Sequence, residues 1–149
     1  MPSTATRIVP LISSGTPGPL GVVHLPRLWT KLTLFSAGLL PEGYDYCGQG
    51  FDQMTLDALG LDRDRVIAFV KERKPTYLQF EQYVTDQNGG SLSKATIEKH
   101  NAAITGYDHS DELGATMRAA SGVKSDSVKD AVTLNTLEDL DELQAEVAS

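Results

Sequence analysis

The chain has 149 residues, of which 40% are hydrophobic and 22% charged, and this is the composition of one folded globular domain, not of a disordered chain. Its formal net charge of −7 argues against broad nucleic-acid binding, because neutralising phosphates requires a basic stripe. The single cysteine excludes an internal disulfide framework, and no apolar run reaches the length of a membrane-spanning helix.

Residues 1–23 are predicted to form an extended arm that packs on the rest of the domain. The segment ISSGTPGPLG within it contains three glycines and two prolines, which fit neither a helix nor a central strand. The start of the chain has too short an apolar core and too many helix breakers for a signal peptide, so we expect a cytoplasmic protein. Residues 24–149 are predicted to form one helical domain.

The first helix is predicted to begin at Pro26, whose missing N–H suits a first helical position. His24, Arg27 and Lys31 lie along one line of this helix, and residues 1–41 contain no Asp or Glu. Two interpretations of this line stay open. It is either a solvated face whose aliphatic stems cover apolar neighbours, or a site for a carboxylate or phosphate bound by the Arg27 fork and the Lys31 point charge. A neighbouring apolar face is predicted to be buried, and it comprises Leu25, Leu28, Trp29, Leu32, Phe35 and Leu39.

The next segment, residues 41–50 (PEGYDYCGQG), is predicted to be an irregular loop because it contains three glycines and a proline. Tyr44 and Tyr46 are either rim aromatics with buried rings and solvated hydroxyls, or donors of hydrogen bonds to a ligand held by the basic helix. Asp52 follows in the first turn of the next helix, where the helix dipole favours an acid. We count it among the candidate binding residues beside that structural explanation.

Two segments, GVVHLPRLWTK and LPEGYDYCGQGFDQMTLDALGLD, resemble a family of small bacterial proteins catalogued only as a domain of unknown function. The shared signature is a His-Leu-Pro-Arg helix start, a lysine one turn on, a tyrosine loop and an acidic helix start ending in Leu-Gly-Leu-Asp. Thr30 stands where the family often has Asp, and His100 stands where it usually has Trp. The resemblance implies one compact helical domain, and it implies no activity because none is assigned to the family as a whole.

Caps and breakers predict further short helices after the loop. No segment has a convincing alternating strand pattern, so the predicted fold class is all-α, a single compact domain of about six to eight short helices. Besides Trp29, Leu32 and Phe35, the aromatic residues Phe69 and Phe80 are predicted to be core. The predicted helices cover residues 51–59, 63–73, 76–86, 94–105 and 111–120, with two more starting at Ser125 and at Asn135 or Thr136.

The sequence lacks the motifs that indicate DNA binding, metal binding or thiol catalysis. The helix at 94–105 would offer DNA only Lys94, Lys99 and His100, so we expect no nucleic-acid binding. The three histidines and the cysteine show no metal-ligand spacing, and we expect neither a metal nor a cofactor. Cys47 is predicted to be an inert, partly buried thiol, with activation by His24 as the alternative.

The function predicted from these residues is a small cofactor-independent enzyme or binding protein acting on a small anionic metabolite. Arg27, Lys31, Tyr44 and Asp52 would bind it, and His24 or Tyr46 would transfer protons. The alternative is a protein–protein interaction or regulatory module that docks through the acidic amphipathic helix predicted at residues 136–147. A homo-oligomer or another protein partner is compatible with either function, and the sequence does not choose between an enzyme and a binder.

Overall fold

The computed structural model describes residues 6–109, 112–123 and 128–148, and in these residues the protein is all-α, as predicted. The only β pairing in the described part is two isolated bridges, and none of its helices is long and apolar enough to cross a membrane. The helices are α1 (Leu25–Ser36), α2 (Phe51–Ala58), α3 (Arg63–Arg73), α4 (Tyr77–Gln87), α5 (Lys94–Thr105), α6 (Glu112–Ala120) and α7 (Ala131–Ala148).

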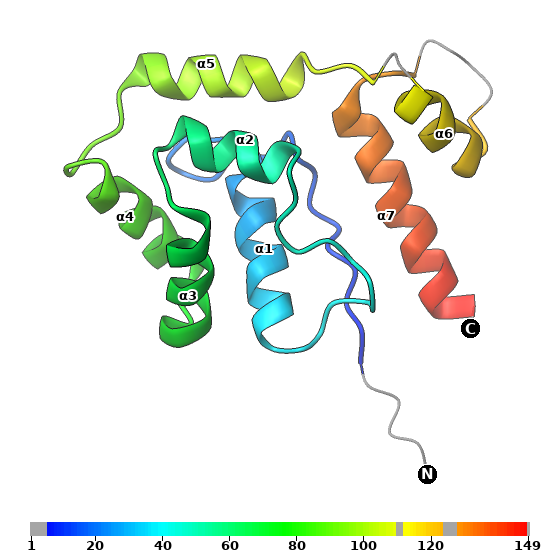
Figure 1. Cartoon of the computed structure of the whole chain (residues 1–149), viewed down its shortest axis with the longest axis horizontal. Coiled ribbons are helices and arrows are strands. Elements are labelled where there is room, and N and C mark those ends of the chain that lie inside the picture. The colour runs from blue at the N-terminus through cyan, green and yellow to red at the C-terminus, as the bar shows by residue number, and fades with distance from the viewer. Residues whose placement is uncertain (1–5, 110–111, 124–127, 149) are drawn as a thin grey trace.

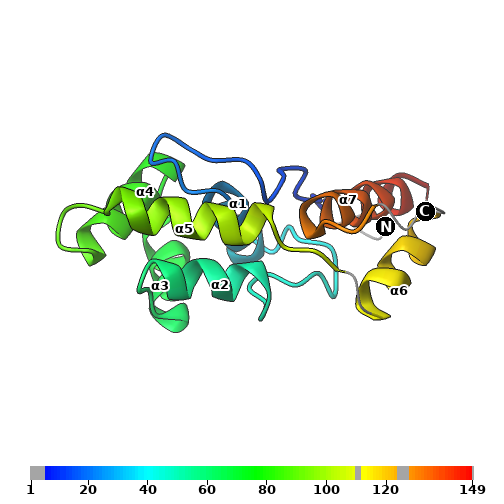
Figure 2. The ribbon, with the colours of Figure 1, turned by 90° about the horizontal axis from the view of Figure 1, so that it is seen from above.

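The helices are arranged around α1 and α5 (Figure 1). Helix α1 packs against α3 and α4, whereas α5 packs against α2 and α7. Figures 1 and 2 place α3 and α4 at one end of the molecule and α6 and α7 at the other, with α5 spanning the distance between them. Helix α7 therefore lies at the end of the molecule opposite α3 and α4, and it packs mainly against α5 and α6.

Local capping explains where the middle helices begin. Asp62 accepts a hydrogen bond from the Arg65 N–H at 3.0 Å, and Ser93 accepts one from the Thr96 N–H at 3.1 Å. Thr76 forms a reciprocal capping box with Gln79. These three predicted helix starts are confirmed.

The C-terminal helix differs from the prediction. Instead of a start at Asn135 or Thr136, α7 begins at Ala131 and runs for 18 residues. Asp130 accepts a hydrogen bond from the Thr133 N–H at 2.9 Å, and this bond caps the first turn of α7. Residue 111, where one predicted helix starts, and Ser125, where another starts, lie outside the described residues.

The main core lies between α1, α2, α3 and α4. Leu32 and Phe80 are buried in it as predicted, while Trp29 and Phe69 are partly buried and pack against it. The prediction for Phe35 is wrong, because its side chain is 42% exposed near the end of α1 and stacks on the ring of Tyr46. The fully buried core side chains include Val22, Leu25, Leu28, Leu56, Leu59, Val66, Val70 and Val84.

Residues 6–23 contain no helix and cross the helical body. Leu20 N–H donates to the Glu81 carboxylate on α4 at 3.1 Å. On α5, the Asn101 side chain accepts from Val23 N–H at 3.0 Å and donates to Gly21 C=O at 2.7 Å. Asn101 therefore fixes the chain immediately before α1.

We expect Asn101→Ala to lower the free energy of unfolding by about 1–3 kcal/mol, because it leaves a backbone donor and a backbone acceptor without their side-chain partner. Urea denaturation at neutral pH measures this loss. Lys99→Ala, an exposed change on the same helix, is the control and is expected to stay within about 0.5 kcal/mol of wild type. Equal stability of the two variants would contradict the anchoring role of Asn101.

Candidate functional site

His24 joins the arm to α1 and has an unusual backbone conformation. Its φ of 70° and ψ of −22° lie in the left-handed region, which costs a non-glycine residue on the order of 1–3 kcal/mol. Asn101 holds the chain before it and Pro26 restricts the chain after it. The side chain is turned into the protein, where it is only 2% exposed. Strain held in place by the surrounding structure is common at functional sites.

The buried side chains His24, Asp52 and Lys31 form a cluster between α1 and the start of α2, which we call the His24 cluster. Asp52 Oδ1 lies 2.7 Å from His24 Nε2, and Asp52 Oδ2 lies 2.5 Å from Lys31 Nζ. The Gly48 N–H also donates to Oδ2, at 2.8 Å. Burial alone would raise the pKa of Asp52, but the hydrogen bond from His24 and the charge of Lys31 outweigh it and hold the pKa well below its usual range.

These contacts determine which nitrogen of His24 carries the proton. Burial lowers the pKa of His24 below its ordinary value, and the hydrogen bond and charge of Asp52 oppose this only in part. The imidazole is therefore neutral at physiological pH, and its Nε2–H donates to the ionised Asp52. Nδ1 then keeps its lone pair, and it is buried without a hydrogen-bond partner in the part of the chain that the structure describes.

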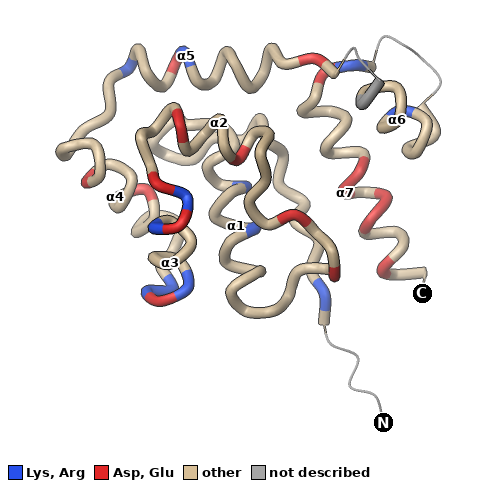
Figure 3. Tube along the Cα trace, in the orientation of Figure 1, with Lys and Arg blue, Asp and Glu red and all other residues tan. Residues whose placement is uncertain are grey.

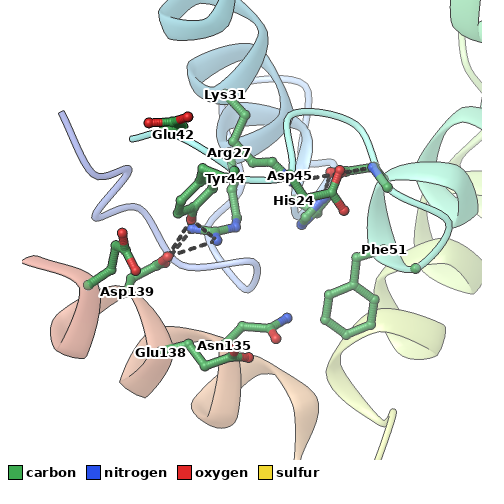
Figure 4. Close-up of a pocket in the computed structure, with 15 residues that line it drawn as sticks. His24, Arg27, Lys31, Glu42, Tyr44, Asp45, Phe51, Asn135, Glu138 and Asp139 are labelled. Atoms are coloured by element: carbon green, nitrogen blue, oxygen red, sulfur yellow. Dashed lines mark hydrogen bonds and ion pairs between the residues drawn. The ribbon is translucent and has the colours of Figure 1, made fainter. Parts of the chain in front are cut away.

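A second cluster, the Arg27 clamp, joins four segments of the chain (Figure 4). Arg27 on α1 binds Asp139 on α7 through both terminal nitrogens, at 2.6 and 3.2 Å. The Tyr44 hydroxyl accepts from Arg27 at 2.9 Å and donates to Asp139. Arg27 also donates to the Ile12 carbonyl of the arm, at 2.9 Å. Burial raises the pKa of Tyr44, so its hydroxyl keeps the proton that it shares with Asp139.

A pocket of about 350 Å³ lies between the two clusters. Its walls come from α1, the loop at 41–50, the start of α2 and one face of α7 (Figure 4). Glu42, Asp45 and Glu138 are exposed and therefore form its mouth, whereas His24 and Asp52 are buried. The lining residues are His24, Arg27, Lys31, Glu42, Gly43, Tyr44, Asp45, Gly48, Gly50, Phe51, Asp52, Asn135, Glu138, Asp139 and Glu142.

Most of the candidate residues from the sequence meet in this pocket: His24, Arg27, Lys31, Tyr44 and Asp52 all line it. Tyr46 is not among its lining residues. The Tyr46 ring stacks on Phe35 with a centroid separation of 3.7 Å, and the Arg63 guanidinium lies 5.6 Å from the ring centre. The structure thus gives Tyr46 a packing role outside the pocket.

The sequence has no acid near the two positive charges of α1, but the structure pairs both of them. Arg27 and Lys31 are each paired with a carboxylate distant in sequence, Asp139 and Asp52. Residues 1–41 contain no acid, and the compensating carboxylates come from other elements of the fold. Neither basic residue is a solvated surface group, since their exposed fractions are 7% and 6%.

Sequence reasoning missed the four residues that α7 contributes to the pocket, which are Asn135, Glu138, Asp139 and Glu142. A signal for them was present. They follow the buried Ala131 at intervals of four, seven, eight and eleven residues, which is the spacing of one helical face.

Two other side chains that could be reactive, Cys47 and His100, are in environments that favour a structural role. Burial raises the pKa of the Cys47 thiol, which keeps it protonated and unsuited to nucleophilic attack. His100 Nε2 lies 3.0 Å from the Val23 carbonyl, and this contact ties α5 to the arm. No group of three or more His, Cys, Asp or Glu side chains in the described residues is arranged to hold a metal ion.

Comparison with known proteins assigns no family to the chain. No family model matches it, and no curated protein matches it either. The resemblance to the small bacterial family therefore stays a prediction. The pocket and the two clusters beside it are the features from which a function can be inferred.

Proposed function

We propose that the protein binds a small polar molecule in the pocket and that His24 is its general base. The observation that carries this proposal is the buried Nδ1 atom of His24, which has no hydrogen-bond partner in the described residues, together with the position of His24 among the residues that line the pocket. Leaving a buried acceptor unpaired costs on the order of 1–3 kcal/mol. A ligand that donates an O–H or N–H to this atom removes that cost.

The surroundings of His24 suit proton transfer. When Nδ1 takes a proton from a bound O–H or N–H group, the N–H bond forms as the ligand's bond to hydrogen breaks. The electron pair of that bond stays on the ligand atom. The resulting imidazolium is stabilised by the ionised Asp52 at 2.7 Å from Nε2, and Lys31 and Gly48 hold Asp52 in place. This arrangement of an acid, an oriented imidazole and a free nitrogen resembles the base half of a catalytic triad.

We expect His24→Asn to weaken retention of the bound molecule at least tenfold, which corresponds to losing one hydrogen bond in a buried site. Asn is chosen because it tolerates a left-handed backbone better than other side chains. Wild type and variant are each equilibrated with a fractionated cell extract, and the retained molecules are identified by mass spectrometry. Phe35→Ala, outside the pocket, serves as the control.

If His24→Asn retained the same molecule as well as wild type, the general-base proposal would be overturned. The same conclusion holds if long-range ¹H–¹⁵N NMR showed a proton on His24 Nδ1 in the free protein at neutral pH. Retention lost in His24→Asn but kept in Phe35→Ala supports the proposal.

A second candidate function is docking to a protein through α7. Three apolar side chains of this helix are exposed at helical spacing: Leu140, Leu143 and Val147, at 48%, 36% and 78%. They lie on a different face from the residues that line the pocket, so the two functions do not compete for the same side chains. Sedimentation of wild type and of Leu143→Glu across a range of concentrations tests for self-association through this face.

A further inference from the structure

The pocket carries an excess of negative charge. Six of its lining residues are carboxylates and two are Arg or Lys. Figure 3 shows acidic residues along α7, whereas α1 carries only basic ones. Asp52 and Asp139 neutralise the two bases, which leaves the four carboxylates of Glu42, Asp45, Glu138 and Glu142.

Arg27 has little left to offer an anion. One terminal nitrogen donates to the Ile12 carbonyl and to Asp139, and the other donates to Tyr44 and to Asp139. Each terminal nitrogen of a guanidinium has two hydrogens, so both are fully engaged. Lys31 is held at 2.5 Å by Asp52. An anion entering the pocket would meet two bases whose charges are already neutralised by carboxylates, and it would also approach four further carboxylates.

One of the residues lining the pocket, His24, carries an unpaired hydrogen-bond acceptor. The His24 side chain is almost fully buried, and its unpaired Nδ1 is an acceptor because the ring proton is on Nε2. This observation is independent of the acidic residues at the mouth and points to a ligand that donates. At the mouth, partial burial raises the pKa of Glu138, and the charge of the neighbouring Asp139 raises it further.

Resting on the proposed function, we propose that the ligand is a small organic cation of the amine or guanidine class. Its N–H groups donate to His24 Nδ1 and to the carboxylates of Glu138 and Glu142. The rings of Phe51 and Tyr44, which line the same pocket, add attraction for a cation over an aromatic face. This replaces the anionic ligand class that the sequence had suggested, because the paired bases and the acids of α7 reverse the charge of the site.

The test is a titration of the full chain followed by NMR of the His24 ring and by calorimetry. The cationic probes are agmatine and putrescine, and the anionic probes are succinate and inorganic phosphate, all at the same ionic strength. We expect agmatine or putrescine to shift the His24 signals at concentrations where the anions do not. Glu138→Gln is expected to weaken this binding about three- to tenfold. Asp141→Asn makes the same charge change on an exposed residue of α7 that does not line the pocket, and it is expected to change binding less than twofold.

The outcomes separate this inference from the proposed function. If succinate or phosphate shifts His24 more strongly than the cations, the cation class is overturned while a ligand pocket at His24 stands. If no probe of either charge shifts His24, both proposals fall. If Glu138→Gln and Asp141→Asn weakened binding of the cations equally, the cations would be attracted to the acidic helix as a whole. That result would overturn binding within the pocket.

Discussion

Asp52→Ala is expected to lower the free energy of unfolding by about 3–5 kcal/mol, because it leaves a buried charge without its partner. Lys31 is 6% exposed and Asp52 is its carboxylate partner at 2.5 Å. The substitution also removes an acceptor from His24 and from the Gly48 N–H. Urea denaturation at neutral pH measures the loss. Asp57→Ala, an exposed acid on the same helix, is the control and should stay within about 0.5 kcal/mol of wild type.

The pH dependence of stability gives a second measurement on the same residue. The folded pKa of Asp52 lies below the unfolded value of about 4, so its contribution is fully present above that pH and is lost as the pH falls. Asp52→Ala should therefore show a shallower loss of stability below about pH 4 than wild type. The folded pKa of His24 is also lowered, from about 6.5, so the unfolded chain binds this proton first and stability starts to fall below about pH 6.5. Parallel acid limbs in the two proteins would contradict the role assigned to Asp52.

The Arg27 clamp leads to the other large effect. Arg27→Ala leaves the Asp139 carboxylate buried without its guanidinium, and breaking a buried pair in this way typically costs about 3–5 kcal/mol. Because α7 is otherwise held mainly by α5 and α6, we expect the loss to appear first as faster amide hydrogen exchange in α7. Exchange in α3 and α4 should change least.

A double-mutant cycle separates the pair from its surroundings. Combining Arg27→Met with Asp139→Leu removes both charges and keeps apolar volume, so the double variant should be more stable than the sum of the single losses predicts. An interaction energy of about 0.5–3 kcal/mol is expected. Additive losses, together with unchanged exchange in α7, would show that the clamp does not hold this helix.

The helices were predictable where their signals are local. Asp62, Thr76 and Ser93 cap the helices that follow them through bonds to residues three positions away, and a sequence window contains both partners. The start of α7 is local too, but Asn135 and Thr136 are equally suitable cap residues further along, and they gave the wrong start. The exposure of Phe35 depends on where α1 leaves the core, and the helical spacing within α1 does not contain that information.

The site was predictable only in part, for the same reason. His24, Arg27 and Lys31 share one helix start, so their proximity follows from spacing alone. The positions of their carboxylate partners do not follow from spacing. Arg27 and Asp139 are 112 residues apart, and Lys31 and Asp52 are 21 residues apart. The sign of the pocket's charge depends on these distant pairings. Tyr44 and Tyr46 lie on an irregular loop without a periodicity that would tell which of them faces inward.

Because the Arg27 clamp joins α1 to α7, the residues of the main core and those of the pocket are completed at different stages of chain synthesis. The main core draws its buried residues from positions 22–84, all of which leave the ribosome well before Asp139 does. During synthesis, α1 to α4 can therefore pack while the guanidinium of Arg27 still lacks its carboxylate. The pocket is lined by residues of α7 as far as Glu142, so it cannot be complete before most of this helix has been synthesised.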